Sequence, residues 1–300
     1  MVKTPYHEGE QAVQKRAGEG HAGWGSPMFE AEIPPMFGLF MERQRMVVIG
    51  AVDDAGAAWS TVLTGPRGFF RAEDSNTVRV DALPVPGDPL EGVFDRPGDI
   101  GMLAIEPQSS QRIRMNGVAV VKDGALVVRT EQVLGNCPKY LQQRVLRADA
   151  PAPAVPAVRR STALSPEQQA WITGADTFFI ASRAPEHGAD ASHRGGAPGF
   201  VQVAAPDRLT WPDYFGNSFY MTLGNLQLDP ACGLTFLDWE GGHALHLSGK
   251  ARIDWDGDRT KAVQGALRLV EFDIEQVVQV SDFTPLRWKF AAPSPFNPTS

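Results

Sequence analysis

The chain has 300 residues, 43% of them hydrophobic, and a formal net charge of −7. That length is enough for two domains of ordinary size, each with its own core. The acidic balance argues against nucleic acid or an anionic membrane as a partner, so any anion site must be local. We find no apolar run of about 18 residues and no signal-peptide pattern, which leaves a cytoplasmic protein as the expectation.

Two cysteines, Cys137 and Cys232, lie far apart in the sequence. Their number and spacing give neither a disulfide framework nor a Cys/His zinc cluster, which favours a reducing compartment and predicts no metal site. Cys137 lies close to Lys139, and a cationic neighbour favours a reactive thiolate. A buried structural cysteine is nevertheless the more common case.

Residues 1–40 predict an N-terminal extension of short helices and loops. Within it, residues 9–18 favour a helix that ends at Gly18, and residues 34–44 favour a short packing helix. From residue 41 to 147, β-branched runs bounded by turn residues predict an antiparallel barrel or sandwich. The expected strands are 46–53, 57–65, 77–82, 100–107, 112–121 and 125–133.

Residues 148–164 are rich in Ala and Pro and predict a semi-rigid linker. Ser165, Pro166 and Gln168 then form a capping-box pattern, which indicates that a helix begins there. The second half, residues 165–300, returns to strand patterns. It adds a late helical segment at 259–270 and a last strand at 272–280.

The two strand-rich halves can be aligned with an offset close to 132 residues. Matches that keep the same order and a nearly constant spacing suggest a duplicated domain. Such a duplication builds within one chain the two-fold interface that a homodimer builds between two chains, and a homodimer of such chains is a further expectation. The matched pairs are Gly56 with Gly188, Ser60 with Ser192, Gly68 with Gly199, Gly101 with Gly233, Gly117 with Gly249 and, after an insertion, Glu131 with Glu275.

Residues 175–255 resemble the pyridoxamine 5′-phosphate oxidase-like family, the FMN-binding split barrels. The resemblance rests on DTFFIASRAPEHGADASHRGGAPGFVQV, then FGNSFYMTLGNLQLDPACGLTFLDW, then LHLSGKARI. The N-terminal half, with HEGEQAVQKRAG and GNCPKYLQQR, is similar to the partner half of long members of unknown function. The resemblance implies a mainly β protein with a few short helices, built as two tandem split β-barrels that pack as an intrachain pseudo-dimer.

In that family FMN binds between two barrels, and basic and hydroxyl side chains after the first hairpin hold its phosphate. The resemblance therefore implies that Ser192, His193 and Arg194 meet the phosphate, and that Thr222 and Asn225 are further flavin or phosphate contacts. Arginine suits this role because its planar guanidinium binds phosphate oxygens in pairs. From the residues alone, SHRGG is also a plausible surface turn, and GNSF and LGNL are ordinary turn sequences.

Two departures from the family pattern bear on function. TLGNLQLDP has no Lys or Arg where the vitamin-synthesising members have them, which argues against pyridoxamine 5′-phosphate oxidation itself. In the N-terminal half, Thr61 and Val62 align with His193 and Arg194, so we expect one FMN site per chain, with the N-terminal half as a wall. The resemblance implies an FMN-dependent oxidoreductase with a small-molecule electron donor or acceptor, and the sequence predicts no catalytic residue.

Three other functions stay open at this point: a non-catalytic flavin-binding protein, a haem-binding or haem-degrading split barrel, and a barrel kept as an oligomer scaffold. A haem would need a ligand such as His7, His243 or His246. His7 also clusters with Glu8 and Glu10 in a segment that reads as a loop.

Aromatic residues are further candidates near a flavin ring. Trp59, Trp239 and Trp288 could stack on an isoalloxazine, although aromatic residues in strands are more often part of the core. Arg287 lies near the C-terminus, which in the family often reaches the partner's flavin.

Overall fold

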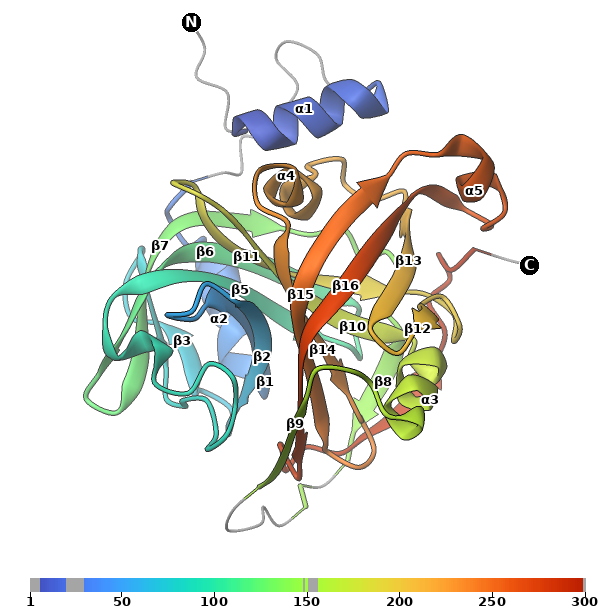
Figure 1. The fold of residues 1–300 in the computed structure, drawn as a ribbon. Coiled ribbons are helices and arrows are strands. Elements are labelled where there is room, and N and C mark those ends of the chain that lie inside the picture. Colours follow the sequence, from blue (N-terminus) through green and yellow to red (C-terminus); the bar gives the residue numbers. More distant parts are fainter. Residues whose placement is uncertain (1–5, 20–29, 148, 151–155, 299–300) are drawn as a thin grey trace, which may run out of the picture.

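The computed structural model describes residues 6–19, 30–147, 149–150 and 156–298, and its fold is mainly β (Figure 1). Two large antiparallel sheets, one in each half of the chain, pack against each other. A small third sheet joins the end of the first half to the C-terminal tail. The expected fold class, two split β-barrels packed as a pseudo-dimer, is confirmed.

The first sheet has seven strands in the order β2-β1-β5-β6-β7-β4-β3, and the main path of the second sheet is β11-β10-β14-β15-β16-β13-β12. The two halves therefore share one topology. The strands of the first sheet are β1 Met46–Val52, β2 Ala58–Thr64, β3 Phe70–Ala72, β4 Thr77–Val80, β5 Gly98–Glu106, β6 Gln111–Lys122 and β7 Ala125–Gly135. Those of the second are β10 Thr177–Ala184, β11 Gly188–Gly195, β12 Gln202–Ala205, β13 Arg208–Tyr214, β14 Ala231–Leu237, β15 Ala244–Asp254 and β16 Ala266–Ser281.

Helices cap and flank these sheets. The sequence-based helices at 9–18 and 34–44 are confirmed as α1 (Glu8–Ala17) and α2 (Pro35–Arg43), and Gly18 closes α1 with a φ of 74°. The Ser165 capping box opens α3 (Pro166–Gly174), also as expected. The remaining helices are α4 (Met221–Leu228), α5 (Gly257–Lys261) and the short 3-10 turn η1 (Val93–Asp95). Among the described residues, none of these helices has the length and apolarity to cross a membrane.

The structure corrects two assignments made from the sequence. The helix expected at 259–270 ends at Lys261, and β16 begins at Ala266, because Gly265 turns the chain with a φ of 73°. Within the expected linker, β9 (Ala157–Ser161) pairs with β16, so this stretch adds a strand to the second sheet. Residues 148 and 151–155 of the expected linker lie outside the described residues.

Strand pairing keeps four of the six matched pairs and moves the two pairs of the first hairpin. Gly101 and Gly233 occupy the same place, and so do the bulge positions Gly117 and Gly249. Glu131 and Glu275 are the residues left out of the ladder at these two bulges. In the first hairpin, however, Gly50 pairs with Ser60 and Gly101, whereas Ala181 pairs with Ala191 and Gly233.

The offset in the first hairpin is therefore 131 residues, and Thr61, not Ser60, is the counterpart of Ser192. Val62 and Leu63 then correspond to His193 and Arg194, which corrects the expected alignment of Thr61 and Val62 with that pair. The same offset relates Gly68 to Gly199, and both have a positive φ. The offset rises from 131 to 132 only later in the chain, because the second half has one additional residue before β14. The sequence alignment of the first hairpin was therefore wrong by one residue, because it was based on the two turn glycines Gly56 and Gly188.

The interface between the sheets depends on glycines at two equivalent crossings. β5 contacts β11, and the counterpart strands β14 and β2 contact in the same way. A Cβ on Gly101 would overlap the backbone of Asp190 and Ala191, and a Cβ on Gly233 would overlap the backbone of Ala58 and Trp59. The two sheets thus meet backbone to backbone, closer than any larger residue allows.

We expect Gly101→Ala to lower the free energy of unfolding by at least about 2 kcal/mol, because the added methyl meets main-chain atoms that cannot rotate away. Gly98→Ala is the matched control in the same strand, since a Cβ there meets no atom within 4 Å. Urea unfolding followed by circular dichroism measures both. Equal stability of the two variants would show that the crossing is not tightly constrained.

Candidate functional site

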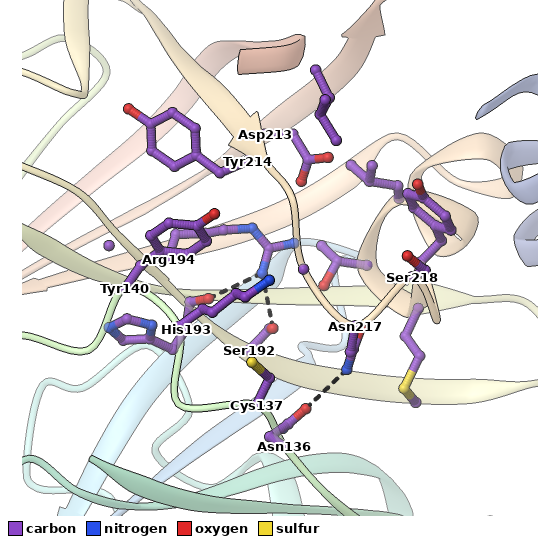
Figure 2. A pocket seen from close by; sticks show the side chains of 18 of the residues that line it. Asn136, Cys137, Tyr140, Ser192, His193, Arg194, Asp213, Tyr214, Asn217 and Ser218 are labelled. Atoms are coloured by element: carbon purple, nitrogen blue, oxygen red, sulfur yellow. Dashed lines mark hydrogen bonds between the residues drawn. The ribbon is translucent and has the colours of Figure 1, made fainter. Parts of the chain in front are cut away.

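A polar cavity of about 110 Å³ lies where the two halves of the chain meet (Figure 2). β6 and the segment 136–140 supply its walls from the first half, and β11, β13 and the start of α4 supply them from the second. The side-chain amide of Asn217 donates to Asn136 Oδ1 at 3.2 Å and links the halves at its edge. The cavity is therefore an interface site, built by the packing of two sheets.

Ser192 and Arg194 of β11 point into this cavity from the same face of the strand, because alternate residues share a face. The Arg194 guanidinium donates to Ser192 Oγ at 2.9 Å and to the His193 carbonyl at 3.1 Å. Figure 2 shows Asp213 and Tyr214 across the cavity from Ser192. Ser192 and Arg194, both predicted from the sequence as phosphate contacts, thus lie side by side in this cavity.

Two arginines of the other half complete the basic group. Arg112 and Arg114 lie two residues apart on β6, and both line the cavity. Arg114 donates to Ser192 Oγ at 2.5 Å and forms a buried ion pair with Asp190 at 3.1 Å. Sequence reasoning missed both arginines, although their alternate spacing in QRIRMNG already placed them on one face of a strand.

Two of these cations have no carboxylate within ion-pair distance in the described part of the chain. Arg112 donates to the carbonyls of Cys137 and Lys139 and to His193 Nδ1, and Arg194 has the contacts given above. Burial, and then the nearby Arg114 and Arg194 guanidinium groups, lower the pKa of Arg112 to about 9. Burial also lowers the pKa of Arg194. A bound anion would relieve the same repulsion and replace the lost hydration.

His193 serves this group as a neutral acceptor. Burial, and then the charges of Arg112, Arg194 and Arg144, hold the pKa of His193 well below its usual value. Since arginine only donates, His193 Nδ1 accepts from Arg112 at 3.1 Å, and the proton lies on Nε2. The ring therefore positions Arg112, and His193 carries no charge toward an anion.

Thr222 and Asn225 lie on α4, not in the turns that their sequence suggested. Thr222 lines the cavity and donates to Asp190 Oδ2 at 3.2 Å. Asn225 lies one turn further along the helix, where it bonds to Ser182 Oγ and His7 Nε2, both at 3.0 Å, and it does not line the cavity. The structure thus brings four of the five predicted residues to one cavity. The fifth, Asn225, lies outside the cavity and contacts Ser182 and His7.

Helix α1 covers α4 from outside (Figure 1). His7 is its N-cap, not a loop residue, and its Nδ1 accepts from the Gly9 amide at 3.2 Å. Glu10 is 4% exposed and accepts a hydrogen bond from the His7 amide. Burial raises the pKa of Glu10 to about 8, with Asp190 adding to the rise and Arg114 opposing it.

The equivalent position in the other half of the pseudo-dimer lacks the basic group. By strand register, Leu63, Ala244 and His246 take the places of Arg194, Arg112 and Arg114. All three are buried, and His246 Nδ1 lies 3.0 Å from the Ser60 carbonyl. The chain therefore carries three arginines at one of two equivalent interface positions.

Other candidates lie elsewhere. His7, His243 and His246 are in separate places, and none lines either of the two large cavities, so the haem hypothesis gains no support. Trp59 is a core residue that donates to Asp53 at 2.9 Å. Trp239 and Trp288 line a different cavity.

Two single residues from the sequence analysis can also be placed. Arg287 donates to the carbonyls of Thr284 and Leu286 and does not line the polar cavity. The sequence analysis gave a buried structural cysteine as the more common case for Cys137. In the structure, Cys137 is partly exposed and lines the polar cavity.

No family model matches the chain, and no curated protein matches it. Among solved structures, a candidate pyridoxamine 5′-phosphate oxidase of Lactobacillus delbrueckii is 18% identical, with a TM-score of 0.32 over 39% of this chain and 94% of its own. HupZ of Group A Streptococcus is 12% identical, with a TM-score of 0.32 over 37% and 90%. An FAD-binding protein of Mesorhizobium loti is 12% identical, with a TM-score of 0.29 over 41% and 98%.

These neighbours include the split-barrel family that the sequence resembles, and each spans less than half of this chain. Likenesses this weak say nothing about the ligand of this chain. The case for a ligand therefore depends on the cavity itself.

The folded state favours protonated Glu10. The free energy of unfolding of the protein should therefore fall as the pH rises from about 4.5 to 8. We expect Glu10→Gln to remove this loss, and to exceed the wild type by about 1–2 kcal/mol at pH 8.5 while matching it near pH 4.5. Urea unfolding across this pH range is the measurement. Glu8→Gln, on the exposed side of the same helix, is the control and should gain nothing at high pH.

Proposed function

We propose that the chain binds FMN, with the phosphate in the polar cavity between the two halves. The observation that carries the proposal is the pair Arg112 and Arg194, two partly buried guanidinium groups with no carboxylate in ion-pair contact among the described residues. A phosphate dianion fits this pair because each guanidinium offers a planar set of donors to its oxygens. The resemblance of residues 175–255 to flavin-binding split barrels favours FMN among phosphate ligands.

The volume of the cavity indicates which part of FMN it would take. About 110 Å³ suits a phosphate and the adjoining chain, and not a three-ring isoalloxazine. Among the residues that line the cavity, the Tyr140 and Tyr214 rings lie 5.1 Å apart, and Leu267 is 45% exposed. This apolar rim offers a surface for the flavin ring.

Bound FMN would supply hydride and electron transfer, and the protein would hold and orient it. Arg112 and Arg194 would hold the phosphate charge. His193 would keep Arg112 in place, and Ser192 would fix Arg194 and Arg114 relative to each other. We propose an oxidoreductase that exchanges electrons with a small-molecule donor or acceptor; a protein that binds FMN without turnover would share the same site.

Titration of the purified protein with FMN and with riboflavin tests the phosphate assignment. Arg112→Gln and Arg194→Gln should each weaken FMN binding about tenfold or more, because each removes a charged hydrogen-bond donor. Riboflavin, which has no phosphate, should bind the variants and the wild type about equally. Arg96→Gln is the control, since Arg96 forms an exposed pair with Asp54.

Equal losses for FMN and riboflavin would contradict a phosphate at these arginines. Failure of the wild type to bind FMN would contradict the proposal as a whole. Oxidation of NAD(P)H by the loaded protein would separate an oxidoreductase from a flavin-binding protein.

The unequal arginine content of the two equivalent positions predicts one FMN per chain. Leu63, Ala244 and His246 offer no cationic pair to a second phosphate. Flavin absorbance against protein concentration, after saturation and desalting, should give a ratio close to one. A ratio near two would show that the position without arginines also binds the cofactor.

A further inference from the structure

A second cavity, of about 520 Å³, lies apart from the polar one and shares no lining residue with it. It is bounded by the small sheet of β8 (Gln143–Leu146) and β17 (Trp288–Ala292), the end of α3 and the end of β14. In Figure 1, β8 and α3 lie together on the side away from α1. Its volume is within the range of small-molecule sites, about 300–1,000 Å³. Its aromatic lining residues are Trp171, Trp239, Trp288 and Phe290.

The aromatic walls already hold one cation of the chain. The Arg144 guanidinium lies 4.4 Å from the centre of the Trp239 ring and 5.9 Å from that of the Phe290 ring. Ring faces attract cations because the π electrons carry negative charge, and tryptophan attracts them most strongly. Asp176 forms an ion pair with Arg144, and their side chains are 12% and 6% exposed, so the charge of this guanidinium is compensated.

Two further carboxylates line the second cavity without a cationic partner. Asp238 and Glu240 belong to the turn that follows β14, and neither has a Lys, Arg or His group within ion-pair distance among the described residues. Asp238 Oδ1 accepts from the backbone amides of Glu240 and Gly241, at 3.1 and 2.8 Å. The lining therefore contains three carboxylates and one guanidinium, which leaves two negative charges without a counter-charge.

This charge balance discriminates between classes of ligand. An anion would be repelled by the two unpaired carboxylates and would find the single guanidinium already paired. A neutral ring would gain only from contact with the walls. A cation gains from the carboxylates and from the ring faces together. If its charge is spread over a flat ring, it also loses less hydration on binding than a compact ammonium group does.

We propose that the second cavity binds a flat organic cation of one or two rings, with its charge delocalised around a ring nitrogen. The tryptophan rings supply the contact surface, and Asp238 and Glu240 supply the counter-charge. This site does not rest on the proposed FMN site, because the two cavities share no lining residue and have opposite charge balances.

Calorimetric titration with N-methylquinolinium and with 1-methylnaphthalene tests the proposal. The two molecules have nearly the same shape, and only the first is charged. The wild type should bind the cation at least about fivefold more tightly than the neutral molecule, because the carboxylates act on the charge alone. High salt should narrow this difference, since it screens charges that are open to solvent.

Charge-removing variants locate the preference within the cavity. Asp238→Asn combined with Glu240→Gln should bring the affinity for the cation down to about that for 1-methylnaphthalene and leave the latter unchanged. Asparagine keeps the Oδ1 that accepts the two turn amides, so the turn should be retained. Trp171→Leu should weaken binding of the cation, because leucine offers no π face. Asp99→Asn combined with Asp123→Asn is the matched control, since it removes the same charge from exposed positions that line neither cavity.

The proposal would be overturned by equal affinities of the wild type for the two molecules, or by absence of binding of the cation. Tighter binding of naphthalene-2-sulfonate than of N-methylquinolinium would also overturn it, and so would an unchanged preference in the variant that lacks both turn carboxylates. Thermal melting followed by circular dichroism should show that this variant is as stable as the wild type, so that its loss of preference reflects charge and not fold. FMN binding is measured separately, so its failure would leave this result unaffected.

Discussion

Close approach of main chains at the glycine crossings is the constraint on which the rest of the structure depends. Gly101 and Gly233 let β5 lie on the backbone of β11, and β14 on that of β2. β6 is the ladder neighbour of β5, so the same crossing brings Arg112 and Arg114 to Ser192 and His193. A site assembled from residues about 80 positions apart thus follows from the absence of two side chains.

The pseudo-symmetry of the fold makes its asymmetry informative. One crossing carries Arg112, Arg114 and Arg194, whereas the equivalent crossing carries Ala244, His246 and Leu63. Asp190 is the carboxylate paired with that basic group, through Arg114. Burying more cations than anions costs free energy, and proteins keep such a cost mainly at functional sites. The crossing without arginines shows that the scaffold itself does not require them.

The sequence predicted local features well and contacts between distant segments poorly. Capping at Ser165 and the end of α1 at Gly18 depend on neighbouring residues, and both were found. The turn interpretation of LGNL, which contains Asn225, was wrong because α4 mixes apolar and polar residues around its axis and shows no helical periodicity. Arg112 was missed because its role arises from a partner strand 81 residues away, a distance that no local pattern encodes.

The chain has a second cavity, of about 520 Å³, which is lined by Trp239 and Trp288 (the aromatic cavity) and shares no lining residue with the polar cavity. Thr177, in the aromatic cavity, pairs through the backbone with Gly195, which lines the polar cavity. Coupling between sites requires an element with two alternative arrangements. Neither Thr177 nor Gly195 has a positive φ that would mark such a strained, switchable position. Ligands of the two cavities should therefore add their stabilisation independently, as expected of two sites built on one fixed scaffold.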